Sequence, residues 1–449
     1  MCGIVGFTGQ REASPILLEG LRRLEYRGYD SAGLITGTGN ELHLRKKAGR
    51  LVELSKNVAA HPAPGCYGIS HTRWATHGGA TDRNAHPHLN SANDIALVHN
   101  GVIENFAPLK QQLQASGVKF RSDTDTEVLV QLVGRFYDGD LADAVRQALA
   151  LVKGTYGVAA MSRHEPGLIV GARFGSPLVI GMGEGGTYLA SDANALAGFA
   201  DKVVYLTDRQ LCTLNGDEWE LRDQDHSPVS VSMHDIAGFL SDGDSEKGDY
   251  PHYMLKEIYE QPEALANAMR GRLSDDDATA HFGGLNLAPQ QLRQIDRIIM
   301  TACGTSYHSG LVGEYLFEEL ARMPVEVEYA SEFRYRNPPI DRSTIVLAIT
   351  QSGETADTLA ALRESKRMGH TTLAICNAVG SSIAREADGG VYLHAGAEIG
   401  VASTKAFTSQ CAVLTMLALY FGRTRHLSSL QGARIIEELR NLPDRKSVV

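Results

Sequence analysis

The second residue of the chain is a cysteine, and its place at the terminus permits an unusual catalytic chemistry. If Met1 is removed, the Cys2 thiol and a free α-amine belong to the same residue. An α-amine has a pKa of about 8, so part of it is an unprotonated base at neutral pH. Nucleophile and base are then neighbours without a histidine, which predicts an N-terminal-nucleophile hydrolase that attacks an amide. The structural alternative is a buried cysteine in a terminal strand.

An amide hydrolase also needs hydrogen-bond donors for the oxyanion that develops on the carbonyl group. The segment LVHNGVIEN offers the side-chain amide of Asn100 and then Gly101, where the lack of a Cβ lets a backbone N–H approach closely. These two residues are the predicted oxyanion hole. The alternative is that Asn-Gly forms a hairpin turn between two apolar runs.

Residues suited to recognising an amino acid lie in two further segments. HTRWATHG contains Arg73, Trp74, Thr76 and His77. An arginine can hold a carboxylate with its two-pronged guanidinium, and the adjacent hydroxyl and imidazole could complete that recognition. SDTDTEV adds Asp125, a candidate partner for a substrate ammonium. A thiol, oxyanion donors and clamps for a carboxylate and an ammonium together fit glutamine, an α-amino acid with a side-chain amide.

Small hydroxyl and amide residues gather in three turns of the C-terminal half. The turns CGTS, TQSGET and GVASTK contribute Thr305, Ser306, Thr350, Gln351, Ser352, Thr355, Ser403 and Thr404. In an open parallel sheet, ligands bind beyond the carboxyl ends of the strands, where helix N-termini present free N–H groups. Such turns could hold a phosphate dianion; the alternative is helix capping, for which Ser and Thr are preferred. Neither GxxxxGK[ST] nor GxGxxG occurs, so nucleotide binding is not indicated.

The elements that must position Cys2 and its partners indicate an α+β domain over residues 1–240. Short apolar runs bounded by Gly, Asn and Asp predict strands at CGIVGFTG, SAGLITG, YGISHTRWATHGG, IALVHNG, YGVAAMS, GLIVGA, SPLVIGMG and TYLASDA. Apolar residues three and four apart predict helices at residues 14–24, 106–116, 125–139 and 141–151. We expect stacked, mostly antiparallel sheets with helices.

The second half of the chain differs in composition and in the predicted order of its strands and helices. A polar, acidic segment, SDGDSEKGDY, is the best linker candidate, and HYMLKEIYEQPEALANAMRGRL after it predicts a helix. From residue 295 onward, fully apolar strands alternate with amphipathic helices, which predicts a doubly wound α/β domain with a parallel sheet covered on both faces. The predicted domains are residues 2–240 and 291–430, with a linker and connecting helices at 241–290 and a terminal segment at 431–449.

Composition excludes several classes of protein. The chain has 449 residues, 43% of them hydrophobic, so two or three domains with substantial cores are expected. The 43 basic and 53 acidic side chains give a net charge of -10, which argues against a general binder of nucleic acids or acidic membranes. The six cysteines are scattered and the histidines between residues 71 and 99 lack ligand spacing, so no disulfide framework or metal site is predicted. Neither a membrane span nor a signal sequence is evident, so we expect a cytoplasmic protein.

The motifs MCGIVG, LEYRGYDSAG, HTRWATHG, NAHPH, VHNGVIEN and SDTDTE closely resemble the class II glutamine amidotransferases, specifically the glutamine:fructose-6-phosphate aminotransferase (isomerizing) family, also called glucosamine-6-phosphate synthases. The resemblance covers essentially all of residues 2–240. It implies that Cys2 is the nucleophile and that Asn100 and Gly101 form the oxyanion hole. It also implies that Arg27 supports Cys2 and that Trp74 gates a path for ammonia; the alternatives are a surface arginine and a core tryptophan. The implied glutamine-binding residues are Arg73, Trp74, Thr76, His77 and Asp125.

The C-terminal half resembles the sugar-isomerase (SIS) domain of the same family, through ACGTSY, TQSGETADT and EIGVASTKAFT. The implied ligand is fructose 6-phosphate, with Val401 and Ser403 on the sugar and no cofactor. The implied phosphate-binding residues are Thr305, Ser306, Thr350, Gln351, Ser352 and Thr355.

Members of this family have two SIS domains, which pair as homodimers, and this chain ends shortly after the first. We therefore expect a truncated member that keeps glutamine hydrolysis and part of the sugar-phosphate site. None of its residues is a candidate for the ring-opening histidine, the Schiff-base lysine or the proton-transferring glutamate of the family. Two alternatives remain, namely an amidotransferase acting on another phosphosugar and a phosphosugar-binding module without catalysis.

Overall fold

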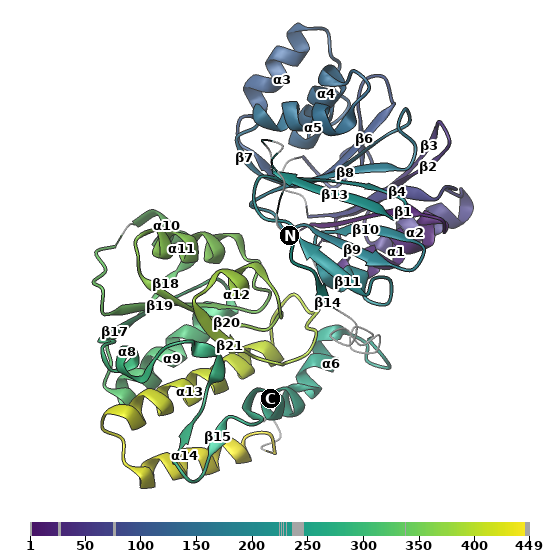
Figure 1. Cartoon of the computed structure of the whole chain (residues 1–449). Helices are drawn as coiled ribbons and strands as arrows, with labels where there is room; N and C mark the ends of the chain where they lie inside the picture. Colours follow the sequence, from purple (N-terminus) through teal and green to yellow (C-terminus); the bar gives the residue numbers. More distant parts are fainter. Residues whose placement is uncertain are drawn as a thin grey trace. The chain divides into compact units, whose positions relative to one another are not determined.

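The computed structural model describes residues 2–25, 28–74, 78–223, 225, 227, 229, 231–235, 247–336 and 338–444. The chain divides into two compact units, residues 1–243 and 244–449 (Figure 1). Three predicted site residues, Arg27, Thr76 and His77, lie outside the described residues. None of the helices in the described ranges is both long enough and apolar enough to cross a membrane.

Two stacked antiparallel sheets form the centre of the N-terminal unit. One has the strand order β14-β11-β9-β10-β1-β4-β2-β3, and the other has the order β13-β12-β8-β7-β6-β5. The strands of the first sheet are β1 (Gly3–Gly9), β2 (Ser31–Thr38), β3 (Glu41–Ala48), β4 (Tyr67–Arg73), β9 (Val179–Gly183), β10 (Gly186–Ala190), β11 (Lys202–Tyr205) and β14 (His234–Asp235). Those of the second are β5 (His88–Leu89), β6 (Ile95–Ile103), β7 (Gly154–Ser162), β8 (Leu168–Phe174), β12 (Gln210–Asn215) and β13 (Glu218–Asp223).

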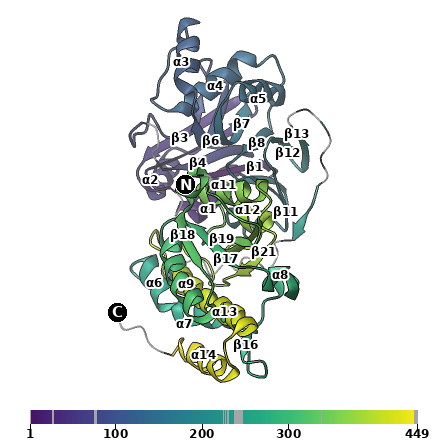
Figure 2. The same ribbon diagram turned by 90° about the vertical axis from the view of Figure 1, so that its left-hand side faces the viewer.

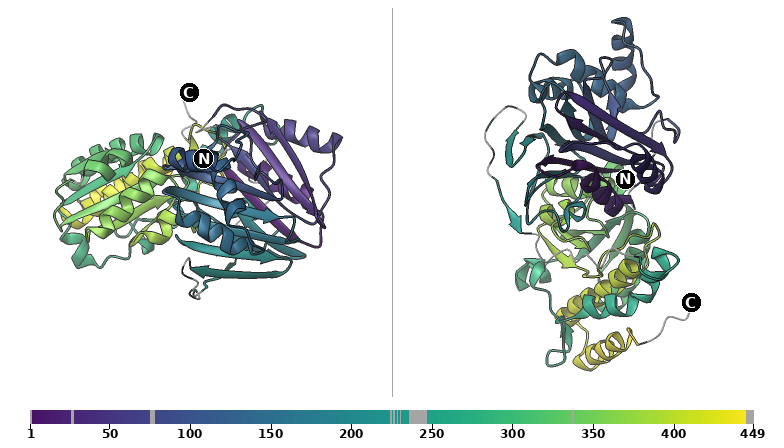
Figure 3. Two further views of the ribbon diagram at one scale, coloured as in Figure 1. Left: turned by 90° about the horizontal axis from the view of Figure 1, so that it is seen from above. Right: turned by 90° about the vertical axis from the view of Figure 1, so that its right-hand side faces the viewer.

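Helices cover the outer faces of both sheets, and the layers can be followed in Figures 1 and 3. The first sheet is covered by α1 (Ala13–Leu24) and α2 (Leu51–Ala60), and a short 3-10 turn, η2 (Ala193–Leu196), packs beside α1. The second sheet is covered by α3 (Phe106–Ala115), α4 (Asp125–Phe136) and α5 (Leu141–Ala150). Alternation along β1 explains this layering, because Val5 and Phe7 face the helices while Ile4 faces the other sheet. The predicted α+β fold is confirmed.

A five-stranded parallel sheet forms the centre of the C-terminal unit, in the order β18-β17-β19-β20-β21. Its strands are β17 (Arg297–Ala302), β18 (Val325–Tyr329), β19 (Thr344–Thr350), β20 (Thr371–Cys376) and β21 (Gly389–Tyr392). On one face lie α9 (Thr305–Ala321) and α13 (Lys405–Arg425), which pack side by side (Figure 2). On the other lie α10 (Ala330–Arg336), α11 (Ala356–Arg367) and α12 (Ser382–Glu386). The predicted doubly wound α/β domain is confirmed.

The segment before this sheet is helical but interrupted. It forms α6 (Tyr253–Tyr259) and α7 (Gln261–Met269), with Pro262 in the first turn of α7. Proline lacks a backbone N–H, so the hydrogen bonding of a single continuous helix cannot pass through this point. Short elements complete the unit, namely β15 (Leu273–Ser274), β16 (Thr279–Ala280), η3 (Gly283–Leu285), α8 (Pro289–Arg293) and α14 (Ser429–Asn441).

Candidate active sites

Strand alternation brings the predicted glutaminase residues onto the facing surfaces of the two antiparallel sheets. The core between the sheets includes Ile4 of β1, Ile69 of β4 and Val98 of β6. Cys2, Arg73 and Asn100 each lie an even number of residues away from one of these, so they share its face. Residues that are far apart in the sequence therefore meet at one end of the layer between the sheets.

Cys2 lies just before β1 and contacts both Trp74 and Asn100. The Trp74 N–H donates to the Cys2 sulfur at 3.2 Å, and the Asn100 Nδ2 group donates to the Cys2 carbonyl oxygen at 3.0 Å. Burial raises the pKa of the Cys2 thiol, and the Trp74 N–H and the Arg73 charge offset this in part. The resting group is therefore a neutral thiol, which needs a base to become a nucleophile.

Asn100 and Gly101 lie inside β6, opposite Gly157 and Tyr156 of β7. The alternative that Asn-Gly is a hairpin turn is therefore wrong. Gly101 has a φ of 133°, and a Cβ there would lie 2.1 Å from the Thr155 carbonyl oxygen, so no other residue fits without a shift of the backbone. Glycine at this position thus has a structural reason, the close approach of the Thr155 backbone, and its role as an oxyanion donor stays a prediction.

Arg73 is buried at the end of β4, and its guanidinium donates to the carbonyl oxygens of Gly78 at 3.1 Å and Gly79 at 3.3 Å. Its pKa is lowered because burial desolvates the charge, while nearby Cys2 and Asp125 act in the opposite direction. Arg73 thus lies close enough to Cys2 and Asp125 to interact with both electrostatically.

Asp125 is the first residue of α4 and is 4% exposed; its Oδ2 accepts from the Ile103 N–H at 2.9 Å. Trp74 is 40% exposed, with its ring edge on Tyr29 at a centroid distance of 5.3 Å. The alternative of a core tryptophan is therefore wrong.

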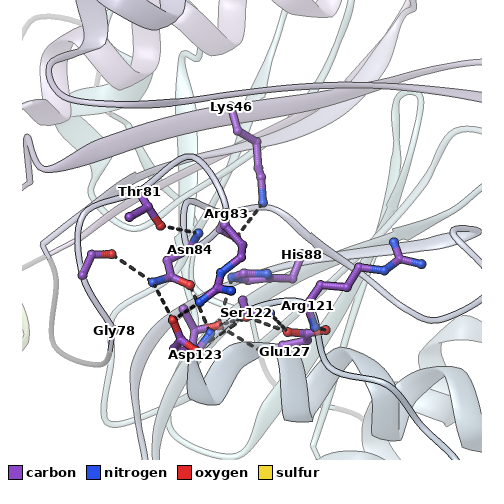
Figure 4. A network of polar contacts seen from close by, with 12 residues as sticks. Lys46, Gly78, Thr81, Arg83, Asn84, His88, Arg121, Ser122, Asp123 and Glu127 are labelled. Atoms are coloured by element: carbon purple, nitrogen blue, oxygen red, sulfur yellow. Dashed lines mark hydrogen bonds and ion pairs between the residues drawn. The ribbon is translucent and has the colours of Figure 1, made fainter.

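The loop that follows Arg73 is tied to the segment that leads into α4 (Figure 4). The Asn84 Oδ1 atom accepts from the Asp123 N–H at 3.0 Å, and the Asn84 Nδ2 group donates to the Gly79 carbonyl oxygen at 3.1 Å. Arg83 forms an ion pair with the Asp123 carboxylate. The loop that provides acceptors for Arg73 is thus anchored beside the turn that leads into Asp125 and α4.

The same turn is held from within by Glu127, which is 1% exposed (Figure 4). Its carboxylate accepts from the backbone N–H groups of Arg121 at 2.8 Å and Ser122 at 2.5 Å. Lys46 lies above this network and donates to the Arg83 carbonyl oxygen at 3.3 Å. Burial lowers the pKa of Lys46 to about 8.

His71, His86 and His88 form a buried cluster of imidazole rings. The rings of His71 and His86 are 4.2 Å apart, and those of His86 and His88 are 4.9 Å apart. Burial lowers the pKa of His71 to about 3 and that of the other two well below the usual value, so all three are neutral. In the described ranges, no group of three or more His, Cys, Asp or Glu side chains could hold a metal ion.

The predicted phosphate-binding turns lie side by side in the C-terminal unit. β17 and β19 are parallel neighbours, with Ala302 opposite Ile349, so the CGTS and TQSGET turns follow at the same edge. The helices after these strands, α9 and α11, cover opposite faces of the sheet. This is the point where the strand order reverses, and ligands of such sheets bind in the crevice there.

The hydroxyls in these turns do not cap the helices. The N-cap residues of α9, α11 and α13 are Gly304, Thr355 and Thr404, and none makes a side-chain capping hydrogen bond. The capping alternative is therefore wrong.

Other contacts shape the two turns. Ser306 Oγ accepts from the Gln410 Nε2 group at 3.0 Å, and within the described part of the chain no side-chain or backbone acceptor takes its own proton, which can then be donated to a ligand. Thr350 Oγ1 accepts from the Gly353 N–H at 3.1 Å and lies 3.4 Å from the Thr355 hydroxyl, while Ser352 Oγ accepts from a backbone N–H within its own turn. Gln351 is partly buried, and its carbonyl oxygen accepts from two backbone N–H groups of the next turn.

The third turn is anchored by carboxylates. Ser403 donates to Glu398 at 2.8 Å, and Glu257 of α6 accepts from the backbone N–H groups of Ile399 and Gly400 at 2.5 and 2.9 Å. Val401, between these anchors, is 73% exposed, and Thr305 at the start of α9 is also exposed.

Four residues that touch the predicted site were not singled out from the sequence, namely His71, Asn84, Glu257 and Gln410. For His71 a signal was available, because it lies two residues before Arg73 on one strand and so shares its face.

Comparison with known proteins agrees with this arrangement. A glutamine amidotransferase domain model matches residues 56–222, and an SIS domain model matches residues 291–420. The fold and the sites thus define a glutamine amidotransferase joined to an SIS domain.

The chain is 49% identical over 451 residues to a glutamine--fructose-6-phosphate aminotransferase (isomerizing) of Chlorobaculum tepidum, covering 99% of this chain and 73% of that protein. It is also 49% identical over 445 residues to the enzyme of the same name from Thermus thermophilus, covering 99% of this chain and 72% of that one. The chain belongs to the glutamine--fructose-6-phosphate aminotransferase (isomerizing) family, which confirms the resemblance seen in the motifs. A solved C-terminal domain of glucosamine-fructose-6-phosphate aminotransferase from Francisella tularensis is 41% identical, over 44% of this chain and 56% of that one, with a TM-score of 0.42.

Proposed function

We propose that this chain hydrolyses glutamine and binds the phosphate of fructose 6-phosphate, as part of an enzyme that transfers the side-chain nitrogen of glutamine to that sugar and so makes glutamate and glucosamine 6-phosphate. Residues 2–240 are the proposed glutaminase domain, residues 291–430 the proposed SIS domain, and residues 241–290 the connection between them. One observation carries the proposal: Asn100 Nδ2 lies 3.0 Å from the Cys2 carbonyl oxygen, and the Trp74 N–H lies 3.2 Å from the Cys2 sulfur. This combines a thiol with hydrogen-bond donors at the chain terminus.

Hydrolysis of glutamine begins at Cys2 once Met1 has been removed. The thiol attacks the side-chain amide carbon, a C–S bond forms, and the thiol proton passes to the α-amine of the same residue. The negative charge that develops on the carbonyl oxygen is stabilised by the Asn100 side chain and the Gly101 N–H. The C–N bond then breaks, and ammonia leaves with the proton held by the α-amine. Water hydrolyses the remaining thioester, which releases glutamate and restores the thiol.

The remaining glutaminase residues are proposed to bind the substrate and guide its product. Arg73, Thr76 and His77 bind the α-carboxylate, and Asp125 binds the α-ammonium. Arg27 supports Cys2. Trp74, whose side chain is 40% exposed although its backbone contacts the sulfur, gates the path of ammonia and completes the glutamine site.

The phosphate of fructose 6-phosphate is proposed to bind where β17 and β19 end. The free hydroxyl proton of Ser306 and the lack of capping bonds in these turns support this placement. The phosphate-binding residues are Thr305, Ser306, Thr350, Gln351, Ser352 and Thr355. Val401 and Ser403 contact the sugar.

We further propose that the protein is cytoplasmic and forms a homodimer, and its mass in solution would test the second point. Glutamine and fructose 6-phosphate are its small-molecule substrates, and no cofactor enters the scheme. No residue of this chain is assigned to ring opening, Schiff-base formation or the proton transfer that completes the aminosugar.

The test combines two assays on purified protein. Glutamate release should be lost in Cys2→Ser and retained in Cys66→Ser, a matched control because Cys66 is also a free cysteine and is exposed. Fructose 6-phosphate should raise the melting temperature of the wild type, and this shift should disappear in Ser306→Ala. Full glutaminase activity in Cys2→Ser, or an unchanged thermal shift in Ser306→Ala, would refute the corresponding half of the proposal.

A further inference from the structure

The imidazole of His71 lies behind the side chain of Asn100. Its Nε2 atom is 2.9 Å from Asn100 Oδ1 and 3.1 Å from the His99 carbonyl oxygen. A carbonyl oxygen can only accept a hydrogen bond, so Nε2 carries the proton. The Asn100 atom that faces this N–H must then be the oxygen, which fixes the amide NH2 group on the opposite side, where it donates to the Cys2 carbonyl oxygen at 3.0 Å.

The protonation state of His71 suits a residue that only donates a hydrogen bond to Asn100. The side chain is 0% exposed, and burial lowers its pKa to about 3 although the bond to Asn100 acts in the opposite direction. Nearby His99 and Arg73 lower the pKa further, so the ring is neutral with one proton. Its Nδ1 atom is buried and has no hydrogen-bond partner among the described residues. The ring therefore donates only at Nε2.

The position of the ring is also fixed. His71 lies in the middle of β4, opposite Ile4 of β1 and Gly33 of β2, and its ring packs on that of His86 at 4.2 Å. A buried nitrogen without a partner costs stability, and an apolar side chain in its place would avoid that cost. An apolar residue could not supply the hydrogen-bond donor at Nε2, which gives a reason for a histidine at this position.

We propose that His71 is a positioning residue that holds the Asn100 amide with its NH2 group toward the oxyanion formed on glutamine. The two ends of a carboxamide have nearly the same shape, so an amide without a donor behind it could turn and present its oxygen to the negative charge. His71 thus acts through Asn100 and does not exchange a proton with the substrate. The inference rests on the proposed glutaminase function.

The test is a double-mutant cycle in the full chain. His71→Phe removes the donor and keeps a ring, and His71→Gln keeps an N–H donor. Loss of an oxyanion donor lowers kcat by about 100-fold to 1,000-fold, and loss of its orientation should cost less, about 10-fold to 100-fold. We expect that loss in kcat for glutamine hydrolysis by His71→Phe, with KM nearly unchanged and partial recovery in His71→Gln. In an Asn100→Ala background, His71→Phe should cost nothing further.

Alkylation of Cys2 by iodoacetamide is the matched control, because this reaction forms no oxyanion. Its rate should be the same in the wild type and in His71→Phe. An unchanged kcat in His71→Phe, or an equal loss in both backgrounds, would overturn the proposal. If His71→Phe does not fold, His71→Leu in both backgrounds decides the same question, because leucine also lacks a donor. Full activity of Asn100→Ala would instead refute the oxyanion role on which the inference rests.

Discussion

Replacing Asn84 with alanine should weaken glutamine binding without slowing the chemical step. Asn84 is 1% exposed, and its amide joins the loop after Arg73 to the turn before Asp125 (Figure 4). It donates to the Gly79 carbonyl oxygen at 3.1 Å, an atom that also accepts from Arg73 at 3.3 Å. The amide therefore stabilises the loop geometry on which the proposed carboxylate clamp depends.

The expected size follows from the hydrogen bonds that are lost. Asn84→Ala removes the bond to Gly79, the 3.0 Å bond from the Asp123 N–H and a longer 3.4 Å bond from Nδ2 to Asp123 Oδ2. The 3.4 Å bond is long and reaches an exposed carboxylate, so it is left out of the sum; each of the two shorter bonds contributes about 0.5–1.5 kcal/mol, so the ordered loop loses about 1–3 kcal/mol. A factor of ten in affinity corresponds to about 1.4 kcal/mol. Because water can reach Asp123, we expect the lower part of this range, a rise of about 5-fold to 20-fold in KM for glutamine.

Initial rates of glutamate release, measured over a range of glutamine concentrations, separate KM from kcat. Asn90→Ala is the matched control, because Asn90 is also buried and its Oδ1 accepts from the N–H groups of Asp94 at 3.0 Å and Ile95 at 3.2 Å. Both variants should lower the free energy of unfolding by similar amounts, but only Asn84→Ala should raise KM. An unchanged KM in Asn84→Ala, or a loss confined to kcat, would refute the reasoning.

Two further predictions concern a buried lysine and a tight turn. Burial lowers the pKa of Lys46 from its usual 10.5 to about 8, so the unfolded chain binds more protons between these values and folding is favoured as pH rises through them. The free energy of unfolding of the wild type minus that of Lys46→Met, measured in urea, should therefore rise from about pH 8 to about pH 10.5; a difference that stays flat would contradict this. Gly353 has a φ of 66° and a Cβ there would lie 1.9 Å from Ser381 Oγ, whereas Gly369 has a φ of 84° and no described atom within 4 Å of its Cβ position. Gly369→Ala should lower the free energy of unfolding by about 1–2 kcal/mol. Gly353→Ala should lower it more and should also weaken fructose 6-phosphate binding in calorimetric titrations. Equal losses of stability in the two variants would contradict the close contact at Gly353.

The sequence was enough to predict the fold class, because the core strands are apolar and regularly spaced. β1, β4 and β6 alternate as strands packed between two layers do, and β17, β19 and β20 are apolar throughout, as buried parallel strands are. Several strands were not predicted. The edge strands β3 and β18, ELHLRKKA and VEVEY, mix charged with apolar residues. The interior strands β11 and β12 were missed as well. Edge strands need few apolar residues, so their sequences carry little signal.

Some residues of the candidate site could likewise be predicted from the sequence, and others could not. The chemical roles of Cys2, Asn100 and Asp125 could be predicted from the type of each side chain and its place in the sequence. The contacts of His71 with Asn100 and of Gln410 with Ser306 span 29 and 104 residues, and no local spacing encodes them. Whether a hydroxyl in a turn caps a helix or remains free for a ligand also depends on tertiary geometry, as Thr355 shows.

The most direct test of Cys2 as a nucleophile that carries its own base is the mass of the N-terminal peptide of active protein. It should be measured before and after reaction with 6-diazo-5-oxo-L-norleucine, a glutamine analogue that alkylates thiols. We predict a peptide that begins at Cys2 and gains one label as glutamate release is lost. Retention of Met1 in active protein, or inactivation with the label on another cysteine, would contradict the proposed chemistry.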